Sequence, residues 1–239
     1  MFNWNDPQAA KIVKDLERCR AGFLQDKELV ISGSSVSLDV ATDIRATIFS
    51  KMVNTINSAI YSVVFLDQDL CDISWWRRIL SRDPSQKTYK LGIEQFDRFA
   101  RFGLLHVTCS IYESFLRIIL RSVDPRACSN GTSEFASIYT ALFRTQLSAG
   151  YSDALEHSNL IRHLRNTIHN NGIFFHKNKN DMKVNYRNKI YTFKFSREID
   201  FVTWEFICEM LCAISATMGL VCLDPVIVSI PSIPDPIAL

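Results

Sequence analysis

The sequence predicts an all-α protein, a bundle of six or seven helices with one small β-hairpin near residues 183–196. Three observations support this fold class. Apolar residues recur at helical spacing along most of the 239-residue chain, Gly and Pro number only eight and seven, and β-favouring residues concentrate in one short segment. The 47% apolar and 22% charged composition is typical of a globular protein. No repeat or long linker divides the chain, so we expect a single domain over residues 1–239.

The first half of the chain predicts four helices. Asp6-Pro7 combines an N-cap residue with a proline at the first helical position, and apolar residues follow at helical spacing. Residues 29–39 are rich in Ser and Val and predict a loop or a short extended piece. The break at Asp83-Pro84 separates two of the helices. The further helices are expected over about 41–66, 74–81 and 92–123.

The second half predicts three more helices around the hairpin. Ser133 is the expected N-cap of a helix to Leu147, and Asp200 is the expected cap of a last helix to about Leu220. Between them lies a helix over 152–170, ended by the left-handed residue Gly172. The hairpin and the last helix, 183–222, belong to the same domain. The proline-rich tail after Asp224 is expected to be irregular and docked.

Cysteine usage and hydropathy bear on the cellular compartment. The seven cysteines are odd in number and show no Cys-x-x-Cys pair, which indicates reduced, buried thiols rather than a metal or redox site. The N-terminus lacks the features of a signal peptide. The apolar segment 201–223 carries Glu205 and Glu209 at helical spacing, which indicates a buried amphipathic helix. We therefore expect a cytoplasmic protein that does not enter a membrane.

The end of the helix over 152–170 holds the residues most suggestive of chemistry. Arg165, Asn166 and His169 share one face with Arg162, away from the apolar stripe, because both arginines lie within about 60° of His169 on the helical wheel. An imidazole titrates near neutral pH and a guanidinium binds phosphate oxygens, so such a group can bind and cleave a phosphodiester. A solvated helix end with a histidine favoured by the helix dipole is the other interpretation.

This pattern resembles the HEPN superfamily. Its signature is an Arg, often followed by Asn, Asp or His, and then a His after four to six residues, late in an all-α domain. Residues 111–116, Ile-Tyr-Glu-Ser-Phe-Leu, are similar to the family's earlier helix with an apolar-Glu-Ser core. Three residues separate Arg165 from His169 and six separate Arg162 from His169, so both arginines are candidates. The family's frequent Tyr just after the His is absent here.

The resemblance implies a metal-independent endoribonuclease that uses no cofactor. A 2′-hydroxyl would attack the adjacent phosphorus, with His169 as general base or acid. Arg165 or Arg162 would hold the non-bridging oxygens, and Asn166 would orient the phosphate or the imidazole. Glu113 is expected behind these residues as an acceptor for Arg or His.

The same resemblance implies partners. Members of the family are commonly dimeric toxins or phage-defence effectors, so we expect RNA, a second copy of the chain, and an antitoxin or other regulatory protein. Asn170, Lys177 and Lys179 are the expected RNA-binding residues beside the helix end. Other family members are not catalytic, which leaves a HEPN-like binding or scaffold protein as the alternative, with an unrelated helical interaction domain as a third hypothesis. Arg101 and His106 also meet the spacing, in an apolar helix.

Overall fold

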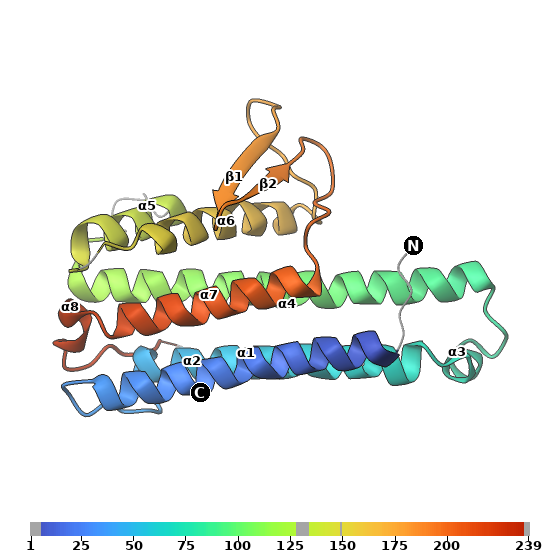
Figure 1. The fold of residues 1–239 in the computed structure, drawn as a ribbon, viewed down its shortest axis with the longest axis horizontal. Helices are drawn as coiled ribbons and strands as arrows, with labels where there is room; N and C mark the ends of the chain where they lie inside the picture. Colours follow the sequence, from blue (N-terminus) through green and yellow to red (C-terminus); the bar gives the residue numbers. More distant parts are fainter. Residues whose placement is uncertain (1–5, 128–133, 149, 237–239) are drawn as a thin grey trace.

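The computed structural model describes residues 6–127, 134–148 and 150–236, and it confirms the all-α class with one small hairpin (Figure 1). Long helices run nearly parallel in three layers, and the hairpin projects beyond the outermost one. The helices are α1 (Asp6–Gly33), α2 (Ile44–Phe65), α3 (Ile73–Leu80), α4 (Gln86–Val123), α5 (Phe135–Ala141), α6 (Ser152–His169), α7 (Trp204–Cys222) and α8 (Pro225–Val228). The strands are β1 (Met182–Tyr186) and β2 (Lys189–Phe193).

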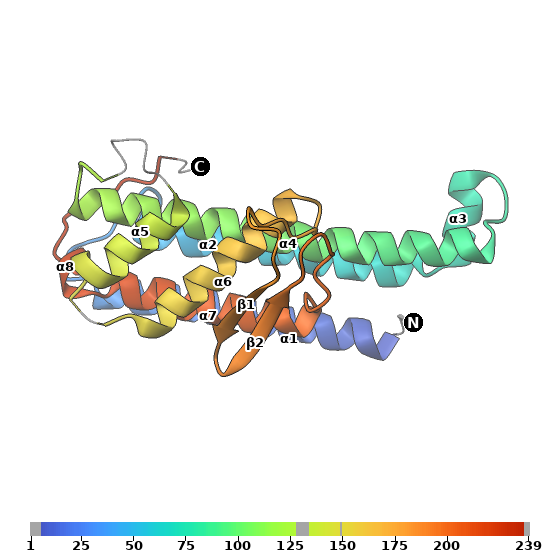
Figure 2. The same cartoon turned by 90° about the horizontal axis from the view of Figure 1, so that it is seen from above.

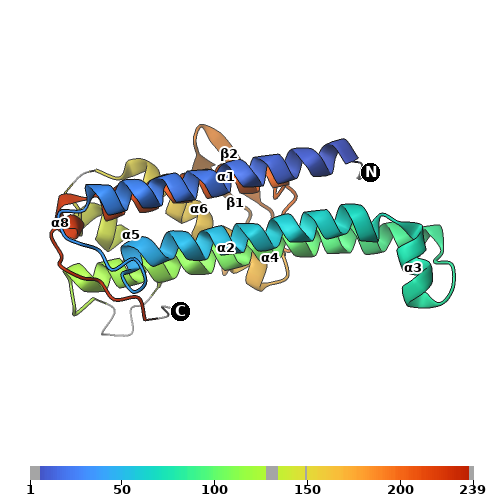
Figure 3. The same cartoon turned by 90° about the horizontal axis from the view of Figure 1, so that it is seen from below.

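The layers share one continuous apolar core. Helices α1 and α2 lie side by side in the lowest layer (Figure 3), and they pack against α7 and α4 respectively. Helix α6 crosses over α4 in the upper layer, with the hairpin beside it (Figure 2). Rings and aliphatic side chains from all three layers meet with no exposed surface, among them Phe23, Phe49, Phe115, Leu160 and Ile214. Burial of this core is the main source of stability and holds the end of α6 on α4.

Three predicted helix boundaries are wrong, and local contacts give the reasons. Helix α1 continues to Gly33 through residues expected in a loop, because Val30 still faces the core. Helix α4 starts at Gln86 rather than residue 92, since Ser85 Oγ accepts a hydrogen bond from the Thr88 backbone N–H at 3.1 Å. Thr203, not Asp200, caps α7.

Other elements lie close to their predicted positions. The helix expected over 133–147 is α5 followed by a π-helical turn at Leu142–Gln146, and its expected cap Ser133 lies outside the described residues. The hairpin is antiparallel, and its two-residue turn places Arg187 and Asn188 at φ values of 48° and 60°. Two consecutive left-handed residues are the requirement of a type I′ turn, which matches the twist of the strands.

The C-terminal tail docks, as predicted, but it contains α8 rather than being wholly irregular. Its anchor is Arg45, which is 1% exposed. Arg45 donates to both carboxylate oxygens of Asp43 and to the carbonyls of Ile227 and Ile230. The backbone N–H of Ile233 completes the cluster by donating to Asp43 at 3.1 Å. The buried arginine therefore ties the tail to the start of α2.

The structure bears on two expectations from the sequence, namely reduced cysteines and buried apolar helices. The six cysteines within the described residues are free thiols, and Cys128 lies outside them. Helices α4 and α7 are long and apolar enough to cross a membrane, but 56% and 67% of their most apolar windows are buried inside the protein. Such burial is typical of the core helices of a folded domain, so the hydropathy of these helices is weak evidence for a membrane span.

Candidate functional site

The candidate site lies where the last turn of α6 meets the middle of α4. Helix α6 ends at His169, and the backbone then turns sharply through Asn171 and Gly172, which have φ values of 57° and 82°. A Cβ atom on Gly172 would lie only 3.2 Å from the Phe102 ring and 3.3 Å from Arg98. Glycine is thus required both by the left-handed backbone and by the close approach to α4. This turn fixes where His169 sits.

His169 faces a second histidine that the sequence motif did not include. The His106 ring on α4 lies 4.9 Å from the His169 ring, centroid to centroid, with the two planes perpendicular. Both imidazoles line a groove of about 500 Å³ between α4 and the end of α6. Arg98, Phe99 and Phe102 also line it, and Phe99 is 72% exposed. The groove therefore combines two proton-transfer groups, a cation and exposed aromatic surface.

The surroundings of His169 favour its neutral form. Partial burial, followed by the positive charges of Arg165 and His106, lowers the pKa of His169 below its ordinary value of 6.5, and Glu113 acts in the opposite direction. An exposed imidazole that is neutral near pH 7 can accept a proton from a hydroxyl group. His169 can thus serve as a general base.

Arg165 lies beside this pair and contacts a buried carboxylate on α4. Its Nε atom is 2.9 Å from Glu113 Oε2, an ion pair that lacks the direction of a hydrogen bond. Arg117 holds the other oxygen of Glu113 at 2.5 Å. Among the described residues, the two terminal amino groups of Arg165 have no acceptor, and its side chain is 32% exposed. Arg165 can therefore still bind an anion, while Glu113 fixes the direction of its guanidinium.

Arg162 does not join the group. Its Nη2 atom instead lies 2.8 Å from Nε2 of the buried His163. Burial, then the charges of Arg162 and His176, lowers the pKa of His163 to about 4, so this imidazole is neutral and accepts from the guanidinium. Of the two candidate arginines, Arg165 is the one whose charge acts on the pKa of His169.

The remaining predicted residues lie around the rim. Asn166 is exposed on the last turn of α6, and its carbonyl accepts a hydrogen bond from the Asn170 side chain at 2.9 Å. The Asn170 amide therefore closes the helix end instead of pointing freely to solvent. Lys177 and Lys179 are exposed in the following loop. Their roles in binding RNA stay predictions.

In the alternative motif, the side chains of Arg101 and His106 contact different parts of the protein. Arg101 pairs with Asp97 at 2.8 Å and donates to the Val202 carbonyl, so it anchors the segment before α7. His106 instead faces His169, across a separation of 63 positions in the chain. Sequence reasoning missed this pairing and missed Arg98, because neither follows from spacing within one helix.

Within residues 6–127, 134–148 and 150–236, no three His, Cys, Asp or Glu side chains gather as a metal-binding group. Comparisons of the chain with models of protein families, with curated proteins and with solved structures found no match.

Proposed function

We propose that the protein is an endoribonuclease that cleaves RNA through attack of a 2′-hydroxyl on the adjacent phosphorus, without a metal ion. The observation that carries the proposal is the His106–His169 pair in an open groove beside a partly unsatisfied arginine. General acid–base catalysis needs one group to take a proton and another to give one. Two facing imidazoles in a single chain meet that need.

The roles follow from the surroundings of each side chain. His169, held neutral, takes the proton of the 2′-hydroxyl as its oxygen bonds to phosphorus. His106, when protonated, gives a proton to the 5′-oxygen as the P–O bond to it breaks. Arg165 binds the non-bridging oxygens with its terminal amino groups, oriented by Glu113. The products are a 2′,3′-cyclic phosphate and a 5′-hydroxyl end.

The biological setting is proposed on the resemblance to the HEPN superfamily. We propose a cytoplasmic toxin or antiviral effector that acts as a homodimer and is controlled by an antitoxin or another regulatory protein. The two imidazoles on one chain lessen the chemical need for a second copy, so light scattering at micromolar concentration is the direct test of the dimer. A solely monomeric mass would remove the paired-site arrangement and leave the single-chain mechanism in place.

Cleavage of total RNA in the presence of EDTA tests the activity. Wild type should cut, and His169→Ala should lose about 100- to 10,000-fold in rate, because it removes a proton-transfer group. His106→Ala should lose a comparable factor, whereas His176→Gln, outside the groove, should not. The rate of the wild type should fall as the pH drops through the lowered pKa of His169. Cleaved RNA that lacks cyclic phosphate ends, or activity that EDTA abolishes and added divalent ions restore, would contradict the mechanism.

A non-catalytic binding protein is the second candidate. The observation in its favour is that Glu113 already pairs with Arg165 and Arg117, so the arginine nearest His169 is partly occupied. An RNA that binds to the wild type and is never cut, with binding lost in Arg165→Ala, would favour this alternative.

A further inference from the structure

The segment that follows the candidate site has a net positive charge, whereas the rest of the chain has a net negative one. Residues 173–198 contain seven Lys and Arg and two Asp and Glu, a net charge of +5. The whole chain has a net charge of only +2, so the rest of it carries −3. The segment includes the hairpin and projects from the helical layers (Figure 1). Charge is therefore separated between the helical body and this appendage.

Both carboxylates of the appendage are engaged in holding its shape. Asp181 accepts a hydrogen bond from the backbone N–H of Phe195 at 2.7 Å, and Glu198 pairs with Arg98 of α4 at 3.2 Å. Two of the seven cations also have partners: Lys189 pairs with Glu209, and Arg187 lies over the Tyr186 ring. The other five are exposed and form no ion pair with any described residue, namely Lys177, Lys179, Lys183, Lys194 and Arg197.

Two aromatic rings of the same segment contact each other, the exposed Phe175 and the half-buried Phe195. The backbone N–H of Phe174 donates to the Arg197 carbonyl, and that of Ser196 donates to the Phe174 carbonyl, so two extended stretches pair. Phe174 points into the core at 3% exposure, and its neighbour Phe175 is 54% exposed. The Phe175 ring stands 6.2 Å from the Phe195 ring, nearly perpendicular to it. An exposed ring in a fixed backbone is free to stack on a flat partner.

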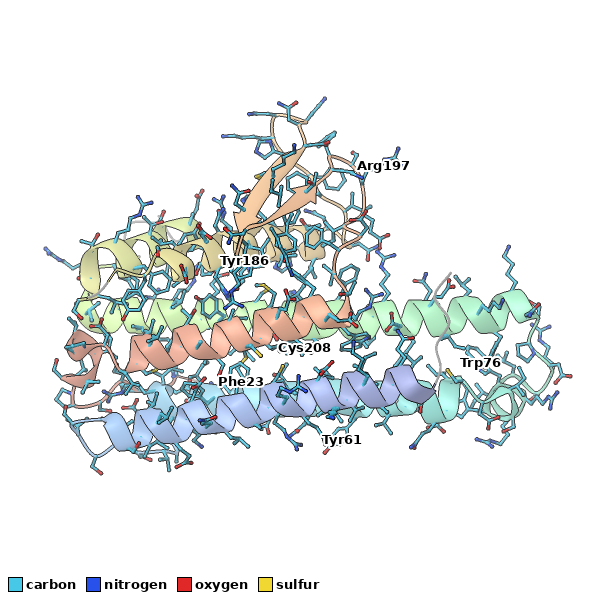
Figure 4. All side chains as sticks on the ribbon, in the orientation of Figure 1. Phe23, Tyr61, Trp76, Tyr186, Arg197 and Cys208 are labelled. Atoms are coloured by element: carbon cyan, nitrogen blue, oxygen red, sulfur yellow. The ribbon has the colours of Figure 1, made fainter. Side chains whose placement is uncertain are left out.

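We propose that Phe175 and Phe195, with the neighbouring cations Lys177, Lys194 and Arg197, form a binding platform for single-stranded nucleic acid. Unpaired bases stack on exposed aromatic side chains, and lysine and arginine neutralise the phosphates. Bases inside a duplex are already stacked on each other, so the platform should select single strands. Figure 4 shows Arg197 at the outer edge of the appendage, away from the helices. The inference rests on the proposed function in that the strand it holds is the RNA to be cut.

The platform is joined directly to the groove. Six positions separate His169 from Phe175, and Arg98 Nη2 donates to the Asn171 carbonyl at 2.9 Å between them. Arg98 also pairs with Glu198 at the other end of the appendage. Arg98, a residue of the groove, thus contacts both ends of the appendage. A strand bound on the platform is therefore held close to the two histidines.

Fluorescence anisotropy with a labelled oligothymidine strand about 12 nucleotides long tests the platform in the full chain. This DNA has no 2′-hydroxyl, so the proposed chemistry cannot cut it. Phe175→Ala should weaken binding about 5- to 100-fold. Tyr61→Ala, which removes an even more exposed ring from α2, should leave the binding unchanged. Lys194→Glu should lower the salt dependence of binding, whereas Lys14→Glu on α1 should not.

An abasic strand of equal length separates stacking from charge. The wild type should bind it more weakly than oligothymidine, and Phe175→Ala should bind both alike. Equal binding of the two strands by the wild type, preference for a duplex, or wild-type affinity in Phe175→Ala would each overturn the platform. Failure of the proposed function gives a different result, in which single strands bind through Phe175 and RNA is never cut. Failure of the platform alone would leave cleavage of RNA in Phe175→Ala at the wild-type level.

Discussion

Two arginine–carboxylate pairs of this protein differ in how completely their hydrogen-bonding groups are used. Arg45 and Asp43 are 1% and 2% exposed; Arg45 also donates to two backbone carbonyls, and Asp43 also accepts from the backbone N–H of Ile233. Arg165 makes one contact, with Glu113, and keeps its terminal amino groups unoccupied within the described residues, near enough to His169 of the groove for its charge to lower the pKa of that imidazole. A fully satisfied buried arginine has nothing left with which to bind a ligand. The incomplete pair is therefore the one with the capacity for function.

The same contrast holds for the histidines. His157 and His163 are buried among rings and aliphatic side chains, and burial is the first cause that lowers the pKa of each. His106 and His169 meet in the groove instead. Buried imidazoles are part of the core, whereas imidazoles that are partly exposed at a shared cavity can exchange protons with a ligand. Each half of this comparison can be tested by substitution.

Arg45→Met should cause the largest change in stability. It leaves Asp43 charged and buried without its partner, and removing one member of a buried ion pair costs about 3–5 kcal/mol in the free energy of unfolding. Urea denaturation of both proteins measures the difference. Arg18→Met on α1 is the matched control, because Arg18 also pairs with an aspartate but its side chain is 70% exposed. Equal effects of the two substitutions would show that burial does not distinguish the arginines.

Arg165→Ala should act on cleavage instead of stability. Loss of a cation that stabilises charge on a transferred phosphoryl group costs about 100- to 1,000-fold in rate. Glu113 keeps Arg117 as a partner, so the free energy of unfolding should change less than in Arg45→Met. Values of kcat/KM on a labelled RNA measure the effect, with Arg162→Ala as the comparison. A larger loss in Arg162→Ala would assign the phosphate to that arginine and the six-residue spacing.

The sequence predicts elements far better than it predicts contacts between them. Helical spacing located α2 and the hairpin to within a few residues, because both depend on local patterns. The rotation of the last turn of α6 also follows from local geometry, so the shared face of His169 and Arg165 could be predicted. His106 was not paired with His169, since only the packing of α6 across α4 brings them together. Arg162 was counted with the site because a helical wheel does not reveal that a long side chain turns toward His163.

Acid should destabilise the fold through the buried histidines. The pKa of His157 is lowered to about 3 by burial, from 6.5 in the unfolded chain. Below pH 6.5, His157 binds a proton in the unfolded chain but stays neutral in the folded protein. The stability that is present above that pH is therefore lost as the pH falls toward 3. The loss from His157 reaches about 2 kcal/mol by pH 5. Urea denaturation at pH 7, 6 and 5 measures it.

His157→Gln should make the free energy of unfolding depend less on pH, although it lowers the stability at pH 7. His163 contributes in the same direction, with a folded-state pKa of about 4. His169→Ala should alter the pH profile less than His157→Gln does, because the ring of His169 is exposed and that of His157 is buried. A profile that responds to His169→Ala and not to His157→Gln would reverse the assignment of the two groups.

The smallest effect on the free energy of unfolding should come from an exposed ion pair. Lys189 and Glu209 join the hairpin to α7 with N–O distances of 3.3 Å, and their side chains are 61% and 47% exposed. Solvent screens such a pair, so a double-mutant cycle with Lys189→Ala and Glu209→Ala should give a coupling of about 0.2–1 kcal/mol. The coupling should vanish near 1 M salt, where the screening length is only about 3 Å. The loss in Arg45→Met should persist at that salt concentration, since no ions reach a pair that solvent does not touch. A coupling that exceeds about 2 kcal/mol and survives high salt would mean that exposure does not govern the strength of these pairs.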